Sequence, residues 1–157
     1  MLPGSRIEER ALQDAQRALL AGGRFFGRLD RAQLERVAGI GRVLAFPQDT
    51  RIYTIGDPVD NFYVLADGMV RFTLGLGKRD TSAGDIIRRG DVFGWAPLVE
   101  GYSRRIATAY CLTPCAVIAL GGAALQELME SDHSLGYAIM KRLAVLLTSE
   151  LTTFAAG

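Results

Sequence analysis

The sequence has little of what marks a secreted or zinc-binding protein. Its 157 residues include only two cysteines, Cys111 and Cys115. Two cysteines are too few for a disulfide scaffold, and there is no pair of C-x-x-C motifs to form a zinc site. We expect both to be reduced, small apolar residues in strands.

Charge of one sign and long apolar runs are also missing. Eighteen basic and seventeen acidic residues leave a net charge of +1, so neither nucleic acid nor an anionic membrane is expected as a general partner. The longest apolar run is far below the roughly 18 residues of a membrane span. Residues 1–4 lead straight into a charged stretch, without the apolar segment of a secretory signal. We expect one domain, residues 1–157, in the cytoplasm.

Catalytic groups are equally scarce. His133 is the only histidine, and no nucleophile–base pair, carboxylate dyad or metal-ligand cluster has a usable spacing. We therefore expect a protein that is not an enzyme, with no catalytic residue, no metal and no cofactor.

Glycine, in contrast, is abundant. There are eighteen glycines, most of them between residues 39 and 101, against a usual frequency of roughly 7%. A glycine-rich middle between glycine-poor ends predicts a turn-dense β core flanked by helices.

Alternation of period two supports this β core. Residues 70–74 alternate apolar and polar side chains, which predicts one buried and one exposed face. Asp67-Gly68 suits a two-residue hairpin turn, and residues 75–84 are expected to form a polar loop. Short strands with regular turns favour a closed barrel or jelly roll over a parallel sheet. The expected strands are residues 42–46, 50–54, 61–66, 69–74, 86–87, 92–93, 106–111 and 115–120.

Helices are expected before and after the core. Residues 7–20 carry apolar side chains at helical spacing, and Gly22-Gly23 ends that helix. Asp30 with Gln33 predicts a capping box for a short helix that ends by Gly39. After the core, residues 123–130 form a helix, and Ser131 or Asp132 caps a longer one that runs to about Phe154.

The last helix has apolar side chains on more than one face. A stripe that packs against the core needs only one face, so the excess predicts a second role, as a lid or as a contact with another subunit. We favour a homodimer through this helix. The apolar residues are Leu135, Ile139, Leu143, Leu146, Leu147, Leu151 and Phe154.

Two motifs, together with this layout, carry a family resemblance. The first runs from Gly56-Asp57 through the apolar residues Phe62–Leu65 to Gly68, and the second runs from Phe93-Gly94 to Arg105. With them the chain resembles the cyclic-nucleotide-binding domain family, as a catabolite-activator-like sensor module without a DNA-binding domain. The resemblance covers roughly Phe25 to Leu151. It implies a mainly β fold with flanking α: an eight-stranded jelly-roll barrel (42–120), a helical lead-in (7–40) and C-terminal helices (122–155).

The second motif resembles the family's phosphate-binding cassette. Gly94 would let the backbone approach a phosphate, and a short helix opening there would direct N–H groups and its positive dipole end at the anion. Arg105 would supply a bidentate, always-ionised donor. The residues expected to bind the ligand are Phe93, Gly94, Trp95, Ala96, Pro97, Leu98, Arg105, Ile106 and Ala107.

Three positions depart from the family's pattern. Trp95 replaces the glutamate that accepts from the ribose 2′-hydroxyl, Pro97 has no N–H to donate to the phosphate, and Ile106 replaces a small or hydroxyl-bearing residue. Two lost hydrogen bonds weaken binding roughly 30- to 1,000-fold. Stacking of Trp95 on a purine would recover part of this.

Other interpretations of the same residues are open at this stage. Arg105 also fits an ordinary surface arginine beside Arg104, and Trp95 fits a core residue as well as a ligand platform. Lys141-Arg142 is typical of a solvated helix face, although a lid over a bound base would also be built there.

The expected function is that of a regulatory sensor that binds a cyclic nucleotide and signals through the C-terminal helix. Cyclic AMP is favoured over cyclic GMP because Ile106 cannot hydrogen-bond a guanine edge. The alternative is a ligand-independent dimerisation module with a degenerate pocket. A haem sensor is a third possibility, with His133 and the two cysteines as the only candidate ligands. Only a few residues follow the last helix, so no direct DNA binding is expected, and the downstream protein is unknown.

Overall fold

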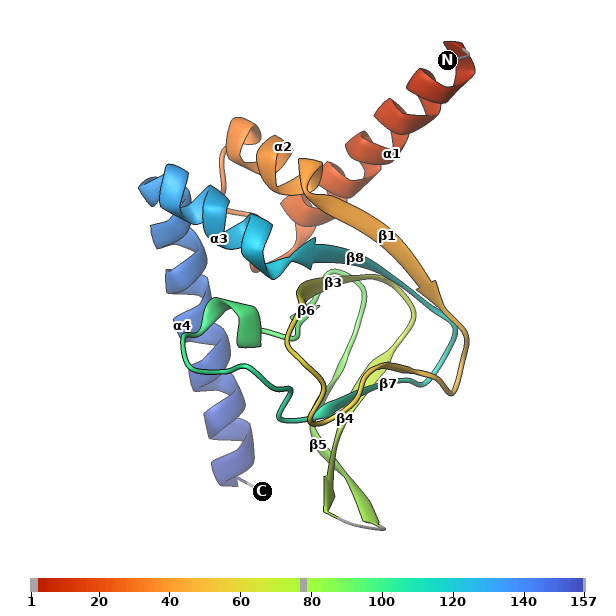
Figure 1. Cartoon of the computed structure of the whole chain (residues 1–157), viewed down its shortest axis with the longest axis vertical. Coiled ribbons are helices and arrows are strands. Elements are labelled where there is room, and N and C mark those ends of the chain that lie inside the picture. Colours follow the sequence, from red (N-terminus) through yellow and green to blue (C-terminus); the bar gives the residue numbers. More distant parts are fainter. Residues whose placement is uncertain (1–2, 77–78, 157) are drawn as a thin grey trace.

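The computed structural model describes the backbone of residues 3–76 and 79–156, and within it the side chains of residues 6–75, 82 and 84–151. Its strands form two four-stranded antiparallel sheets (Figure 1). The first has the order β1 (Gly41–Phe46), β8 (Cys115–Gly121), β3 (Asn61–Asp67), β6 (Val92–Phe93). The second has the order β2 (Arg51–Tyr53), β7 (Thr108–Cys111), β4 (Val70–Leu76), β5 (Arg79–Ile87).

These sheets confirm a β core of two antiparallel sheets with flanking helices. Among the described residues no strand pairing joins one sheet to the other, so a single closed barrel is not seen. The jelly-roll connectivity stays a prediction, as does the division of the chain into the segments 7–40, 42–120 and 122–155.

Two of the helices, α2 and α4, begin at caps that the sequence predicts. The elements are α1 (Pro3–Gly22), α2 (Arg31–Gly39), α3 (Gly122–Ser131), α4 (His133–Ala156) and a 3₁₀ turn, η1 (Ala96–Leu98). Asp30 Oδ1 accepts from the Gln33 N–H at 2.8 Å and the Gln33 side chain accepts from the Asp30 N–H, which confirms the capping box. Asp132 caps α4 by accepting from the Leu135 N–H at 3.1 Å.

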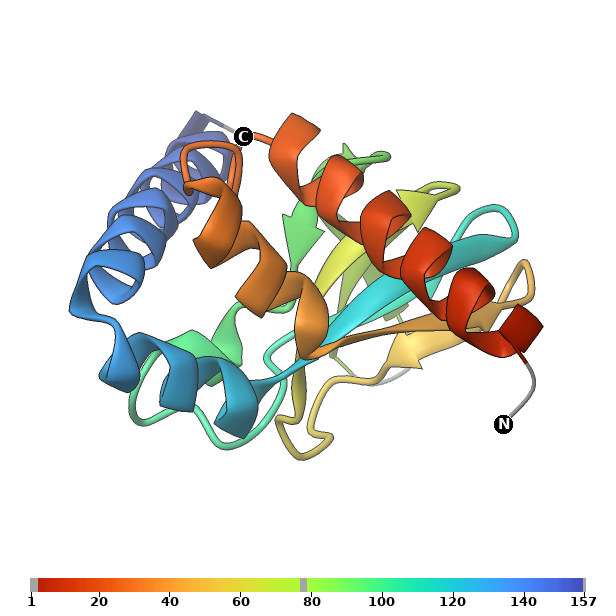
Figure 2. The ribbon, with the colours of Figure 1, turned by 90° about the horizontal axis from the view of Figure 1, so that it is seen from above.

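The inner strands of the first sheet, β3 and β8, are buried on both faces. On β3, Phe62 and Val64 pack against the helices, while Tyr63 and Leu65 pack against the second sheet. This explains the unbroken apolar run at Phe62–Leu65, because alternate side chains enter two different cores. Figure 2 shows the helices gathered on the side of the first sheet, with α4 running along one end of the molecule.

The predicted hairpin at Asp67-Gly68 is wrong. The strands on either side, β3 and β4, belong to different sheets, so the turn is a corner between sheets. Gly68 does have a positive φ of 99°, and a Cβ there would lie 2.5 Å from the Pro114 carbonyl oxygen. The sequence identified the backbone conformation correctly but not which strands pair.

The predicted polar loop over residues 75–84 is also wrong for most of its length. From Arg79 onward the chain forms β5 and pairs with β4, for example Leu74 with Thr81 and Thr73 with Ser82. β5 is an edge strand, where polar side chains are common and the ladder satisfies the backbone whatever the side chains are. Residues 77–78 lie outside the described residues.

The apolar residues of α4 are partly buried by contacts within the chain. Leu135, Ile139 and Leu143 are buried in the core against the first sheet, and Leu146 and Leu147 are half-buried. Leu151 is exposed, and the side chain of Phe154 lies outside the described residues. Each helix in the described part of the chain is too short or too polar to cross a membrane.

Candidate functional site

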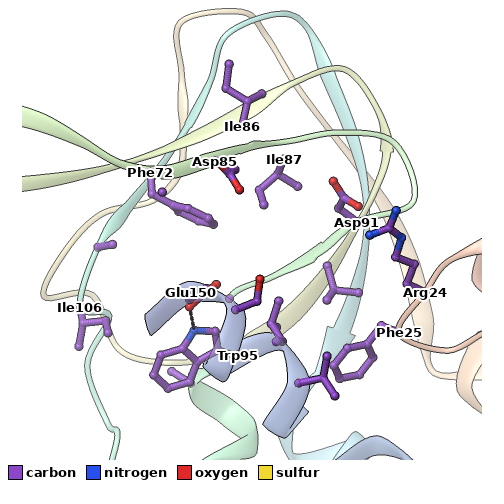
Figure 3. A pocket seen from close by; sticks show the side chains of 18 of the residues that line it. Arg24, Phe25, Phe72, Asp85, Ile86, Ile87, Asp91, Trp95, Ile106 and Glu150 are labelled. Atoms are coloured by element: carbon purple, nitrogen blue, oxygen red, sulfur yellow. Dashed lines mark hydrogen bonds between the residues drawn. The ribbon is translucent and has the colours of Figure 1, made fainter. Parts of the chain in front are cut away.

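A cavity of about 350 Å³ lies where the second sheet, the residue 93–107 region and α4 meet. Phe72 and Leu74 of β4 and residues 85–87 of β5 form one wall, and the second half of α4 forms another. Arg24 and Phe25, in the connection between α1 and α2, reach its rim (Figure 3). The walls are mainly apolar with a few polar groups, the usual character of a small-molecule site.

Six of the nine predicted ligand-binding residues line this cavity. The other three serve packing: Phe93 lies in the core between the sheets, Leu98 lies in the core under the helices, and Pro97 contacts the start of α3. The carbonyl of Pro97 also accepts from Gln126 Nε2 at 2.8 Å. The six residues at the cavity are Gly94, Trp95, Ala96, Arg105, Ile106 and Ala107.

Arg105 is the most deeply buried charged residue that faces the cavity. Only 3% of it is exposed, which rules out an ordinary surface arginine; Arg104 beside it is exposed. The Nη1 group of Arg105 donates to the Gly94 carbonyl at 3.1 Å, and its Nη2 group donates to Asp60 Oδ1 at 3.0 Å and to the Asn61 carbonyl.

Two aromatic rings complete the surroundings of Arg105. Its guanidinium carbon lies 4.1 Å from the centre of the Tyr53 ring and 5.8 Å from that of Tyr63, within the range of cation–π attraction. The Nε atom of Arg105 is buried and has no hydrogen-bond partner among the described residues. A buried, unpaired N–H carries a free-energy cost that an anionic ligand would relieve.

Gly94 is required beside this arginine. Its φ is +73°, and a Cβ built there would lie 3.0 Å from Arg105 Nη1 and 3.1 Å from the Tyr63 ring. A side chain would therefore be strained by the backbone and would press on the guanidinium.

The segment after Gly94 differs from the predicted short helix. It is one 3₁₀ turn, η1, of three residues with Pro97 inside it. So short a turn has no appreciable macrodipole, and the argument for a positive helix end pointing at the anion is wrong here. Any contribution of η1 to an anion site would have to come from its individual backbone N–H groups.

Trp95 lines the cavity and also packs against the core under the helices. It is half-buried, packs edge-on against Tyr102 with ring centres 5.2 Å apart, and donates from Nε1 to Glu150 Oε2 of α4 at 3.2 Å. Burial raises the pKa of the Glu150 carboxyl above its ordinary value, and the Trp95 hydrogen bond opposes that rise.

The sequence predicted only part of the cavity wall that α4 forms. The face that enters the core at Leu135, Ile139 and Leu143 continues along the cavity in the second half of the helix. The prediction of a solvated pair at Lys141-Arg142 holds for Lys141, which is exposed, but not for Arg142, which is half-buried at the cavity. The α4 residues at the cavity are Arg142, Val145, Leu146, Ser149 and Glu150.

Several site residues were missed at the sequence level. Four residues distant in the chain surround Arg105: Tyr53 of β2, Asp60 just before β3, and Asn61 and Tyr63 of β3. The cavity residues of α4 between 142 and 150 were also not predicted, although their spacing of three or four residues is that of one helix face.

The candidate metal and haem ligands lie elsewhere. Within the described residues no group of three or more His, Cys, Asp or Glu side chains is placed to hold a metal ion. His133 is exposed at the start of α4, Cys111 and Cys115 are buried thiols, and none of the three lines the cavity. Burial raises the pKa of the Cys111 thiol to about 12.

Comparison with solved structures shows the same fold in a cyclic nucleotide-binding domain and in two regulators. A cyclic nucleotide-binding domain from Methylobacillus flagellatus is 21% identical, with a TM-score of 0.75, over 89% of this chain and 78% of that one. The sensor domain of the transcriptional regulator DNR from Pseudomonas aeruginosa is 18% identical, with a TM-score of 0.74, over 89% and 93%. The c-di-GMP-responsive global regulator CLP from Xanthomonas campestris is 21% identical, with a TM-score of 0.72, over 81% and 62%.

Sequence comparison identifies the family of the chain. No curated protein matches the chain. The family model for the cyclic nucleotide-binding domain, however, matches residues 43–132, which is more than half of the chain and includes both motifs and every residue that surrounds Arg105. The chain therefore belongs to the cyclic nucleotide-binding domain family.

Proposed function

We propose that this chain is a regulatory, non-enzymatic sensor that binds a cyclic nucleotide in the cavity and signals through α4. The observation that carries the proposal is Arg105, buried at the cavity wall with an unpaired Nε–H. Arginine has five N–H donors, and the residues around it use three.

Asp60 is a competitor for the phosphate. Its carboxylate already accepts from Arg105 Nη2, but 63% of the Asp60 side chain is exposed. Because an exposed partner is easily displaced into water, a cyclic phosphate would replace Asp60 at modest cost. This competition, with the loss of the cassette glutamate, supports weaker binding than an intact cassette gives.

Cyclic AMP is the favoured ligand. The side chain beside Arg105 on the cavity wall is Ile106, which is half-exposed and offers no donor or acceptor to a guanine edge. The remaining wall is mainly apolar, and the face of Trp95 offers a stacking surface for a purine.

Signalling through α4 is supported by the contacts of this helix with both the core and the cavity. A ligand in the cavity would touch the second half of the helix, while the first half is anchored in the core. Ligand binding would then bias the position of the helix end, a two-state response of the kind that relays signals.

A ligand-independent dimerisation module is the second candidate. Tyr137 and Leu151 are 71% and 70% exposed, and Met140 is 43% exposed. These residues share one face of α4 that points away from the cavity and the core, so the helix can contact a second copy whether or not a ligand is bound.

Calorimetric titration with cyclic AMP, cyclic GMP and c-di-GMP tests the proposal. We expect saturable binding of cyclic AMP, at least as tight as that of cyclic GMP. Arg105→Ala should weaken it roughly 30- to 1,000-fold, equivalent to about 2–4 kcal/mol, whereas the exposed Arg104→Ala should change little. Arg105→Lys keeps the charge if the alanine variant does not fold. Equal losses from Arg104 and Arg105 substitutions, or tighter binding of either other nucleotide, would contradict the proposal.

A further inference from the structure

The α4 wall of the cavity carries a carboxylate at the point where the cassette has lost one. Trp95 stands at the cassette position that holds glutamate in the family pattern. Its indole N–H reaches across the cavity wall to Glu150 of α4 (Figure 3). Glu150 is thus hydrogen-bonded to the side chain that replaces the cassette glutamate.

We propose that Glu150 accepts the hydrogen bond of the bound nucleotide's ribose 2′-hydroxyl, in place of the cassette glutamate. This assignment rests on the proposed function, since it concerns the same cavity. Trp95 acts as a positioning residue, because its N–H fixes the carboxylate at the cavity wall.

The hydrogen bonding of Glu150 leaves room for such a donor. A carboxylate offers about four acceptor positions on two oxygens, and the contact from Trp95 engages Oε2. The half-buried carboxyl also has a pKa raised by burial, which indicates that its anion is short of solvent and donors. A ligand hydroxyl would supply one of the missing hydrogen bonds.

The other carboxylates at the cavity fit this role less well. Asp85 and Asp91 are both exposed, and Asp91 accepts from the Arg88 backbone N–H at 3.0 Å in its own turn. Both lie on the β5–β6 side of the cavity (Figure 3). Glu150 is the one of the three that is hydrogen-bonded to a cassette residue.

The consequence is that the ligand itself would tie the second half of α4 to the cassette. In an intact cassette the glutamate and the phosphate site belong to one segment. Here the phosphate would be held by Arg105 and the ribose by α4, so the ribose contact would report directly on the position of the helix.

Comparison of cyclic AMP with 2′-deoxy cyclic AMP tests the assignment. We expect the wild-type chain to favour cyclic AMP roughly tenfold, the value of one hydrogen bond to a charged acceptor. Glu150→Met keeps the shape but removes the acceptor, so the two ligands should bind within about twofold of each other. Trp95→Phe, which keeps the ring but loses the N–H, should reduce the preference partly. Glu130→Met, at an exposed position on α3, should leave it unchanged.

The outcomes distinguish a wrong assignment of Glu150 from a wrong proposed function. If the wild type binds both ligands equally, or if Glu150→Met keeps the tenfold preference, the assignment of Glu150 is wrong while cyclic-nucleotide binding stands. If the wild type binds no cyclic AMP, the proposed function fails and the assignment fails with it. Glu150→Gln, which retains a neutral acceptor, should give an intermediate preference and guards against a folding defect in the methionine variant.

Discussion

At the scale of single residues, Gly94 and Arg105 are fitted to each other. The guanidinium occupies a space bounded by two tyrosine rings and by oxygens of Asp60, Asn61 and Gly94. Any Cβ on residue 94 would enter that space.

Gly94→Ala should therefore destabilise the protein by about 1–3 kcal/mol, because alanine is strained at positive φ and crowds Arg105. Urea denaturation gives the change in free energy of unfolding. Gly22→Ala is the matched control: it ends α1, has no positive φ and meets nothing within 4 Å, so its effect should be neutral or slightly stabilising. Similar small effects at both positions would show that the fit around Arg105 is unimportant for stability.

Glu150 should cost stability at neutral pH. Its pKa in the folded chain is raised above the unfolded value by burial, so the folded state holds its proton to higher pH and loses stability as the pH rises through that pKa. Glu150→Gln should unfold at an equal or higher temperature than the wild type at pH 7, with the difference shrinking as the pH falls toward 4. A Glu150→Gln variant that is less stable than the wild type at pH 7 and equally stable at pH 4 would contradict this prediction.

At the scale of elements, α4 has one face that packs inside the molecule and one apolar face that is exposed. One face enters the core and then the cavity, while the other, with Tyr137, Met140 and Leu151, is exposed. Substituting Leu146 would disturb the cavity, so the exposed face is the better place to test self-association.

We expect the chain to be a dimer at tens of micromolar by sedimentation, with Tyr137→Glu shifting it to a monomer because a charge replaces exposed apolar surface. Gln48→Glu adds the same charge on an exposed loop and should leave the dimer intact. A wild-type monomer at this concentration would contradict the dimer proposal.

The helices and strands also show which parts of the fold sequence patterns can predict. Alternation located β4, short apolar runs located β3 and β8, and helical spacing and capping signals located the helices, because each depends on neighbours in the chain. Most of β5 was missed, apart from the predicted residues 86–87, because its polar side chains suit an edge strand that is defined only by its partner β4. Likewise, the arginine of the cassette was readable from its motif, but Asp60 and Tyr53 beside it depend on pairing between distant strands.

At the scale of the whole molecule, the cavity lies where three separately anchored parts meet. The second sheet, the residue 93–107 region and α4 each contribute to the walls. A ligand there would contact all three, so its binding energy would be coupled to their relative positions.

Fluorescence titration of the wild-type chain with cyclic AMP directly measures ligand binding in the cavity, because Trp95 is the only tryptophan and lines the cavity. We expect a saturable change in Trp95 emission. Arg105→Lys should shift that change to at least tenfold higher ligand concentration, since lysine lacks the guanidinium fork. No change in emission up to millimolar cyclic AMP, or the same titration curve in Arg105→Lys, would contradict it.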